Sequence, residues 1–215
     1  MYLNEEFKSA SVSQLIRWWN GDDVPEWSKG MALFLQKTAH ALSLAGSEGV
    51  EFLRTQVESK DVSKRAIVLG KLADPRIADE KAAQYLVNAF SEKQSDEPEI
   101  DSGFKTIALN RLVGISYFPL KRGEVESLLE HEDKWLAAAA MVYLSHAFEC
   151  EAVEILRAGL ESRNPAMRAH ACTEAGFRNI RQLKEKVALL LKDDDTYVAN
   201  AAQIGCEMFD IVYGD

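Results

Sequence analysis

The sequence predicts an all-α fold, an α-solenoid built from helical hairpins that repeat every 31 residues. Residues able to cap a helix recur at this interval, and apolar residues precede and follow each cap with helical spacing. The chain has 215 residues and is 47% hydrophobic, which is enough for a continuous core. Repeats of this length bury their apolar faces only by stacking on one another. We therefore expect one domain over residues 1–215.

Residues 1–48 are expected to form an atypical N-terminal helical cap. The segment SVSQLIRWW predicts one helix, NGDDVP a break, and WSKGMALFLQKTAHALSLA a longer helix that ends near Gly46. Lys37 falls where the repeat would place an apolar residue, and terminal repeats are usually irregular because one face meets water. Trp18, Trp19 and Trp27 are concentrated here, and one left exposed would mark a contact surface.

Residues 49–215 are expected to form about five hairpins. Asp61 fits as the first cap, with apolar residues at helical spacing on both sides, but it precedes Ser102 by 41 residues rather than 31. The polar, proline-containing segment SEKQSDEPEIDS accounts for the difference. It predicts an inserted exposed loop over residues 91–102.

From that point the 31-residue register is regular. The predicted caps are Ser102, Asp133, Asn164 and Asp195. Positions three, seven and eleven after each cap form one helical face, whose middle members are Leu109, Ala140, Ala171 and Ala202. A second apolar stripe precedes the caps and contains Val125, Leu156, Val187, Leu129, Leu160 and Leu191. Each unit is thus predicted to be a helix, a short polar turn and a second helix.

The stretch NPAMRAHACTEAG at residues 164–176 resembles the HEAT-like repeats typified by bilin lyases. DDDTYVANAAQIG and KDVSKRAIVLGKLA look like weaker copies. The resemblance implies a right-handed superhelix whose second helices line a concave surface. Arg65 and Arg168 match the arginine four residues after the cap, whereas the other repeats lack it. A ladder joining cap carboxylates to these arginines is therefore expected to be incomplete.

Composition limits the classes of partner. The 34 acidic residues outnumber the 25 basic ones, so the net charge of -9 disfavours nucleic acid, which is held by lysine and arginine. No stretch approaches the roughly 18 apolar residues of a membrane span, and no secretory signal opens the chain. Cys150, Cys172 and Cys206 lie in helical patterns and predict small buried residues in a reducing compartment. These features predict a cytoplasmic protein.

The second helices carry the candidate partner-binding surface. Their outward positions are aromatic, small or sparingly polar, and aromatic and arginine side chains dominate binding hot spots. The alternative is that these aromatics pack between repeats as core. The candidate residues are Phe104, Arg111, Trp135, His146, His170 and Tyr197.

Other chemistry finds little support in the sequence. No two histidines have the three- or four-residue spacing of a helical metal site, so we expect no metal and no cofactor. Cys172 and His170 are two positions apart and point to different helix faces, so they do not predict a catalytic pair. Acidic clusters at residues 130–133 and 193–195 lie at helix starts and are interpreted as caps, with a ridge for a basic partner as the alternative.

We expect a non-catalytic scaffold that binds another, basic protein, for example a bacterial immunity or inhibitor protein covering a basic toxin. Two alternatives come from the family resemblance. One is a bilin lyase-like enzyme acting on a tetrapyrrole chromophore. The other is a HEAT-like DNA glycosylase, which the net charge disfavours.

Overall fold

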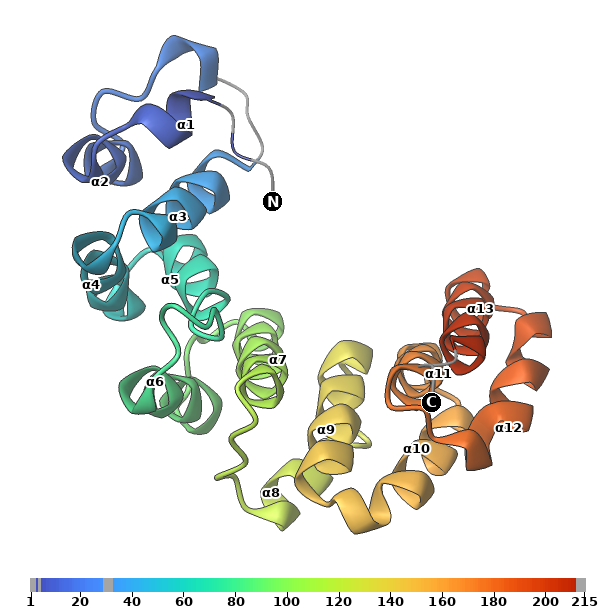
Figure 1. Cartoon of the computed structure of the whole chain (residues 1–215). Helices are drawn as coiled ribbons and strands as arrows, with labels where there is room; N and C mark the ends of the chain where they lie inside the picture. Colours follow the sequence, from blue (N-terminus) through green and yellow to red (C-terminus); the bar gives the residue numbers. More distant parts are fainter. Residues whose placement is uncertain (1–2, 4, 29–32, 212–215) are drawn as a thin grey trace. The chain divides into compact units, whose positions relative to one another are not determined.

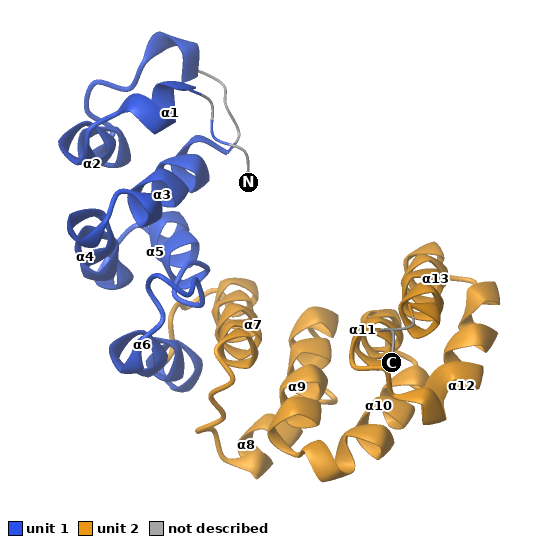
Figure 2. Ribbon diagram, in the orientation of Figure 1, with its two compact units in different colours: residues 1–92 blue, residues 93–215 orange. Residues whose placement is uncertain are grey.

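The computed structural model describes residues 3, 5–28 and 33–211. This part of the chain is 73% helical and contains no strand (Figure 1). It divides into two compact units, residues 1–92 and residues 93–215 (Figure 2). No single helix among the described residues is long and apolar enough to cross a membrane, although Lys134–Ala147 and Glu149–Leu160 pass that test together as a pair bent by 111°.

The first unit consists of short helices. They are α1 (Glu5–Ser9), α2 (Val12–Asn20), η1 (Glu26–Ser28), α3 (Phe34–Leu44), α4 (Ser47–Thr55), η2 (Gln56–Glu58), α5 (Val62–Leu69) and α6 (Glu80–Ser91). The helix expected at SVSQLIRWW is confirmed as α2, which Ser11 caps by accepting from the Gln14 N–H. The longer helix expected next is wrong at its start. Trp27 and Ser28 lie in the separate turn η1, residues 29–32 are outside the described residues, and α3 begins only at Phe34.

Aromatic residues fill the core around α2. Phe7, Trp18, Trp27 and Phe34 contact one another with ring centroids 5.5 to 6.2 Å apart. Trp19 is fully buried, and its indole Nε1 donates to Gln56 Oε1 at 3.1 Å. Only Trp27 of the three tryptophans keeps substantial exposure, so this concentration of tryptophan serves mainly packing.

In the second unit, four long helices pack side by side in chain order, α7 on α9, α9 on α11 and α11 on α13. The shorter helices α8, α10 and α12 each contact the long helix that follows them. The elements are α7 (Pro98–Gly114), α8 (Arg122–Glu126), α9 (Lys134–Ala147), η3 (Glu149–Glu151), α10 (Ala152–Leu160), α11 (Pro165–Phe177), η4 (Arg181–Leu183), α12 (Lys184–Leu189), η5 (Leu190–Lys192) and α13 (Thr196–Asp210).

Three of the four regularly spaced caps are confirmed. Asp133, Asn164 and Asp195 each accept a backbone N–H from the first turn of the helix that follows. Asp61 caps α5 in the same way. A further cap, Asp79 at the start of α6, was not predicted.

The cap predicted at Ser102 is wrong, and the exposed loop predicted over residues 91–102 is confirmed only for residues 92–97. Helix α7 begins at Pro98, so only residues 92–97 separate it from α6. Proline fixes the backbone for a first helical turn, and Glu99 and Asp101 stabilise that turn electrostatically, so residues 98–102 of this polar segment are helical. Ser102 instead donates its hydroxyl hydrogen to the carboxylate of Asp133, the residue 31 positions later.

The predicted stripes form the core of the second unit. The stripe after the caps is fully buried at Leu109, Ala140, Ala171 and Ala202, and so is the stripe before them at Val125, Leu156 and Val187. Leu191 is an exception at 45% exposure. It lies in the tighter turn η5, where the α-helical register that would turn it inward is lost.

Helices α11 and α13 approach closely because glycines face each other. A Cβ on Gly176 would lie 2.6 Å from both the Cα and the carbonyl oxygen of Gly205. A Cβ on Gly205 would lie 2.5 Å from the carbonyl oxygen of Cys172. No side chain fits at either position without moving one helix away from the other.

Candidate functional site

Three of the predicted site residues form one surface cluster, called here the aromatic patch: Trp135 of α9, His170 of α11 and Tyr197 of α13. The rings of Trp135 and Tyr197 are 5.6 Å apart and inclined at 76°. Trp135 and His170 are 6.2 Å apart and inclined at 82°. These edge-to-face contacts are favourable for aromatic rings. Trp135 and Tyr197 nevertheless remain 43% and 47% exposed, so the patch meets solvent.

The repeat register explains why these rings meet. Trp135 and Tyr197 each follow a cap by two residues, and their backbone N–H groups donate to the carboxylates of Asp133 and Asp195 at 2.9 and 2.8 Å. Helix α11 lies between α9 and α13, and Ala166 occupies the same register position there. Its methyl group is small and buried, which leaves room for the two larger rings to touch.

The electrostatics of the patch favour a neutral imidazole. Burial lowers the pKa of His170 below its ordinary value of 6.5, and the carboxylate of Glu174 opposes this only in part. His170 therefore contributes an aromatic, uncharged contact at neutral pH. The ammonium group of Lys134 lies 5.5 Å from the centroid of the Trp135 ring, so this indole already receives a cation from its own chain.

His146 belongs to a neighbouring cluster. Its Nε2 is 2.9 Å from Glu174 Oε2, which joins α9 to α11, and its ring stacks on Phe118 at 6.4 Å. His146 follows Trp135 by eleven residues, roughly 16 Å along a helix. Glu174 is one turn after His170 on α11, and its carboxylate contacts His146 and acts electrostatically on His170. This cluster borders the aromatic patch and is not part of it.

The remaining two predicted site residues lie elsewhere. Phe104 is 2% exposed and belongs to the core, which is the alternative that the sequence left open for the aromatics. Arg111 is exposed near the C-terminal end of α7.

From the sequence, Glu174 is considered only beside Cys172 and His170 as part of a catalytic group, which the sequence does not favour. The contacts of Glu174 and Phe118 with His146 were not predicted. The four-residue spacing from His170 could have indicated Glu174, whereas no local signal indicated Phe118 because its contact with His146 joins a loop to α9.

The cysteine prediction holds for one residue and fails for another. Cys172 is fully buried, and burial raises the pKa of its thiol to about 12. Cys150 is exposed in the short turn η3, outside the regular helices that the buried stripe follows, so its prediction as a buried residue is wrong. Cys206 is intermediate.

Arg168, the arginine expected to bind the carboxylate of a neighbouring cap residue, binds Asp193 instead of the cap Asp195. Arg168 donates from Nε and Nη2 to Asp193 at 2.8 and 2.9 Å, and from Nη1 to the carbonyl oxygen of Ser162. Asp193 in turn accepts the N–H of the cap residue Asp195. The arginine thus reaches the following cap through one intermediate residue, and part of the acidic cluster at 193–195 is structural.

Negative charge is concentrated in the second unit. Residues 93–215 contain 21 acidic and 14 basic side chains, while residues 1–92 contain 13 and 11. Within the described residues, no group of three or more histidine, cysteine, aspartate or glutamate side chains is arranged to hold a metal ion. No protein-family model matches the chain, and no curated protein matches it.

Proposed function

We propose that residues 93–215 form a protein-binding module whose aromatic patch anchors a basic partner protein. The observation that carries this proposal is the exposure of Trp135 and Tyr197, two large side chains from different helices whose rings contact each other edge to face. Exposed aromatic residues that are ordered before binding lose little conformational entropy on association, and tryptophan and tyrosine are enriched among binding hot spots.

Charge supports a basic partner. The second unit carries an acidic surplus of seven side chains, and such a surface attracts and orients positively charged proteins. Since His170 stays neutral at physiological pH, it does not oppose a cation. A concrete form of this function is a bacterial immunity or inhibitor protein that covers a basic toxin.

The finer architecture of the proposed module is a HEAT-like solenoid. Its support is the 31-residue recurrence of the caps Asp133, Asn164 and Asp195, together with the side-by-side packing of α9, α11 and α13. Hydrogen bonds also link neighbouring repeats at the caps, since Asn164 Nδ2 donates to the carbonyl oxygen of Lys134 at 3.0 Å. Solenoids of this kind present rows of second helices to their partners.

The test is affinity capture with the full-length chain, followed by affinity measurement with the captured protein after purification. The variant is Trp135→Ala combined with Tyr197→Ala. The matched control is Phe177→Ala, which removes an exposed aromatic side chain that lies at the end of α11, outside the patch. We expect a basic protein whose affinity falls at least tenfold in the double variant, about 1.4 kcal/mol, and changes little in the control. The proposal would be contradicted if the double variant and the Phe177→Ala control bound the captured protein with the same affinity, or if the captured protein were acidic.

A further inference from the structure

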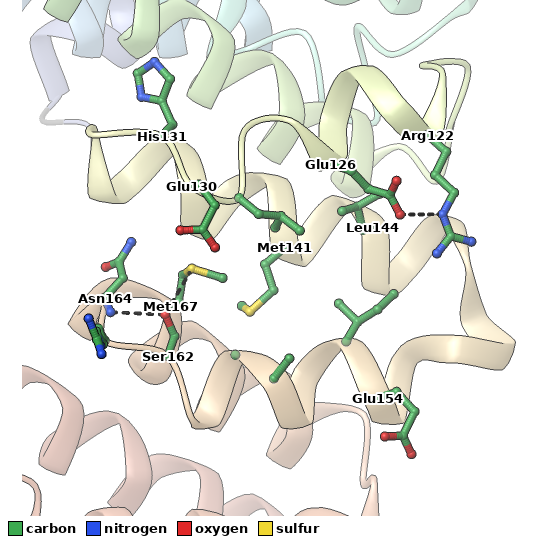
Figure 3. Close-up of a pocket in the computed structure, with 15 residues that line it drawn as sticks. Arg122, Glu126, Glu130, His131, Met141, Leu144, Glu154, Ser162, Asn164 and Met167 are labelled. Atoms are coloured by element: carbon green, nitrogen blue, oxygen red, sulfur yellow. Dashed lines mark hydrogen bonds and ion pairs between the residues drawn. The ribbon is translucent and has the colours of Figure 1, made fainter.

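A cleft of about 770 Å³ lies between α8, α9 and α10 (Figure 3). It is separate from the aromatic patch, because Met141 and Leu144 follow Trp135 by six and nine positions and so project from the other side of α9. The volume is in the range of small-molecule sites. Its apolar lining consists of Leu129, Met141, Leu144, Ile155, Ala158, Gly159 and Met167.

Local helix lengths explain why the cleft is open. Helix α10 runs for nine residues, whereas α8 ends at Glu126 and residues 127–130 continue as turns. Positions 31 residues before α10 are 121–129, so the repeat would extend α8 to residue 129. This last helical turn is missing. Gly159 shapes the floor, because a Cβ there would lie 2.2 Å from Met141 Sδ. Because glycine has no Cβ, the thioether of Met141 has room beside Gly159 and lines the cleft.

Most charges around the cleft are already neutralised. Arg122 donates to Glu126 at 2.6 Å and binds Glu151 through two hydrogen bonds of 2.8 Å. Glu154 pairs with Arg157. His131 Nδ1 accepts the backbone N–H of Asp133 at 3.0 Å.

Glu130 differs from the other lining carboxylates because it has no ion-pair or hydrogen-bond partner among the described residues. Figure 3 shows its carboxylate extending into the space beside Met167 and Ser162. Arg163 also lines the cleft; it is exposed, and its guanidinium has no partner among the described residues. A bound cation would be attracted by Glu130 and repelled by Arg163.

We propose that this cleft binds a small apolar compound with a single positive charge, such as a primary alkylamine. The leucine, isoleucine and methionine side chains receive the hydrocarbon part, and flexible thioethers adapt to its shape. Glu130 pairs with the ammonium group at the edge of the apolar floor, where its charge is not already satisfied. The proposal does not depend on the function proposed for the aromatic patch.

The experiment is NMR of the full-length chain labelled with ¹³C at the methionine methyl groups, titrated with hexylammonium and, separately, with hexanoate. Met141 and Met167 report on the cleft, and Met208 in α13 is outside its lining. We expect hexylammonium to shift the Met141 and Met167 signals saturably without moving that of Met208. Hexanoate should bind at least fivefold more weakly.

Three charge variants complete the test. Glu130→Gln should weaken hexylammonium binding at least threefold, and Arg163→Gln should strengthen it. Glu132→Gln is the control, because it removes a nearby exposed carboxylate outside this cleft and should change little. Three results would overturn the proposal: unshifted Met141 and Met167 signals, tighter binding of hexanoate, or equal binding by wild type and Glu130→Gln.

Discussion

At the scale of single residues, the register position of a side chain predicts its helix face but not its exposure. Phe104 and Trp135 both stand two positions after a predicted cap, yet Phe104 is 2% and Trp135 43% exposed. Since α7 begins at Pro98, Phe104 lies in its second turn, while Trp135 is the second residue of α9. The sequence could therefore indicate which aromatic residues share a helix face, but not that Trp135 and Tyr197 would contact each other beside Ala166.

The lowered pKa of His170 makes stability depend on pH in a defined window. The unfolded chain binds a proton at His170 near pH 6.5, whereas the folded chain does so only at lower pH because burial disfavours the imidazolium. The free energy of unfolding should thus fall as the pH drops below 6.5. Urea denaturation between pH 7.5 and pH 5 should show a smaller fall for His170→Gln than for wild type, and parallel curves for the two proteins would contradict this assignment.

The three thiols should react at different rates with an aromatic disulfide reagent. Cys150 is exposed and should react first. Burial raises the pKa of Cys206 and, further, that of Cys172, which is also fully inaccessible. We expect Cys172 to react only as fast as the second unit unfolds, measured by mass spectrometry of the labelled peptides. Labelling of Cys172 within the time needed for Cys150 would contradict its burial.

At the scale of elements, the caps and apolar stripes identified α9, α11 and α13 because cap and core spacing are local properties of a helix. The predicted start of α7 was wrong since Pro98 and acidic first-turn residues resemble a loop in composition. The early end of α8, which opens the cleft, was also not predicted. Its stripe residue Val125 is fully buried as expected, so the apolar pattern gave no sign that the helix would stop one residue later.

The close approach of α11 and α13 predicts opposite outcomes for two glycine substitutions. Gly176→Ala should lower the free energy of unfolding by about 1–3 kcal/mol, because the new methyl group overlaps the backbone of Gly205. Gly123→Ala in α8 meets nothing within 4 Å and should raise it by up to about 1 kcal/mol through helix propensity. Urea denaturation measures both changes. If the two substitutions changed the free energy of unfolding equally, the close contact of Gly176 with Gly205 would be contradicted.

At the scale of the whole molecule, the recurring caps and apolar stripes predicted an all-helical chain and the composition an acidic one, and the described residues are mostly helical and contain no strand. Net charge alone did not indicate where the acidic surplus would lie. The division into two compact units places most of it in residues 93–215, together with the aromatic patch. The proposal of a basic partner therefore applies to this unit.

Hydrogen–deuterium exchange of the complex with a captured basic partner tests the central claim most directly, because it locates the interface without altering a residue. We predict slower exchange in the first turns of α9 and α13 and in α11 around His170, with no change in residues 1–92. Full-length Trp135→Ala, Tyr197→Ala protein serves as the control and should show little protection at matched concentrations. Protection confined to residues 1–92, or its absence from α9, α11 and α13, would contradict the aromatic patch as the partner-binding site.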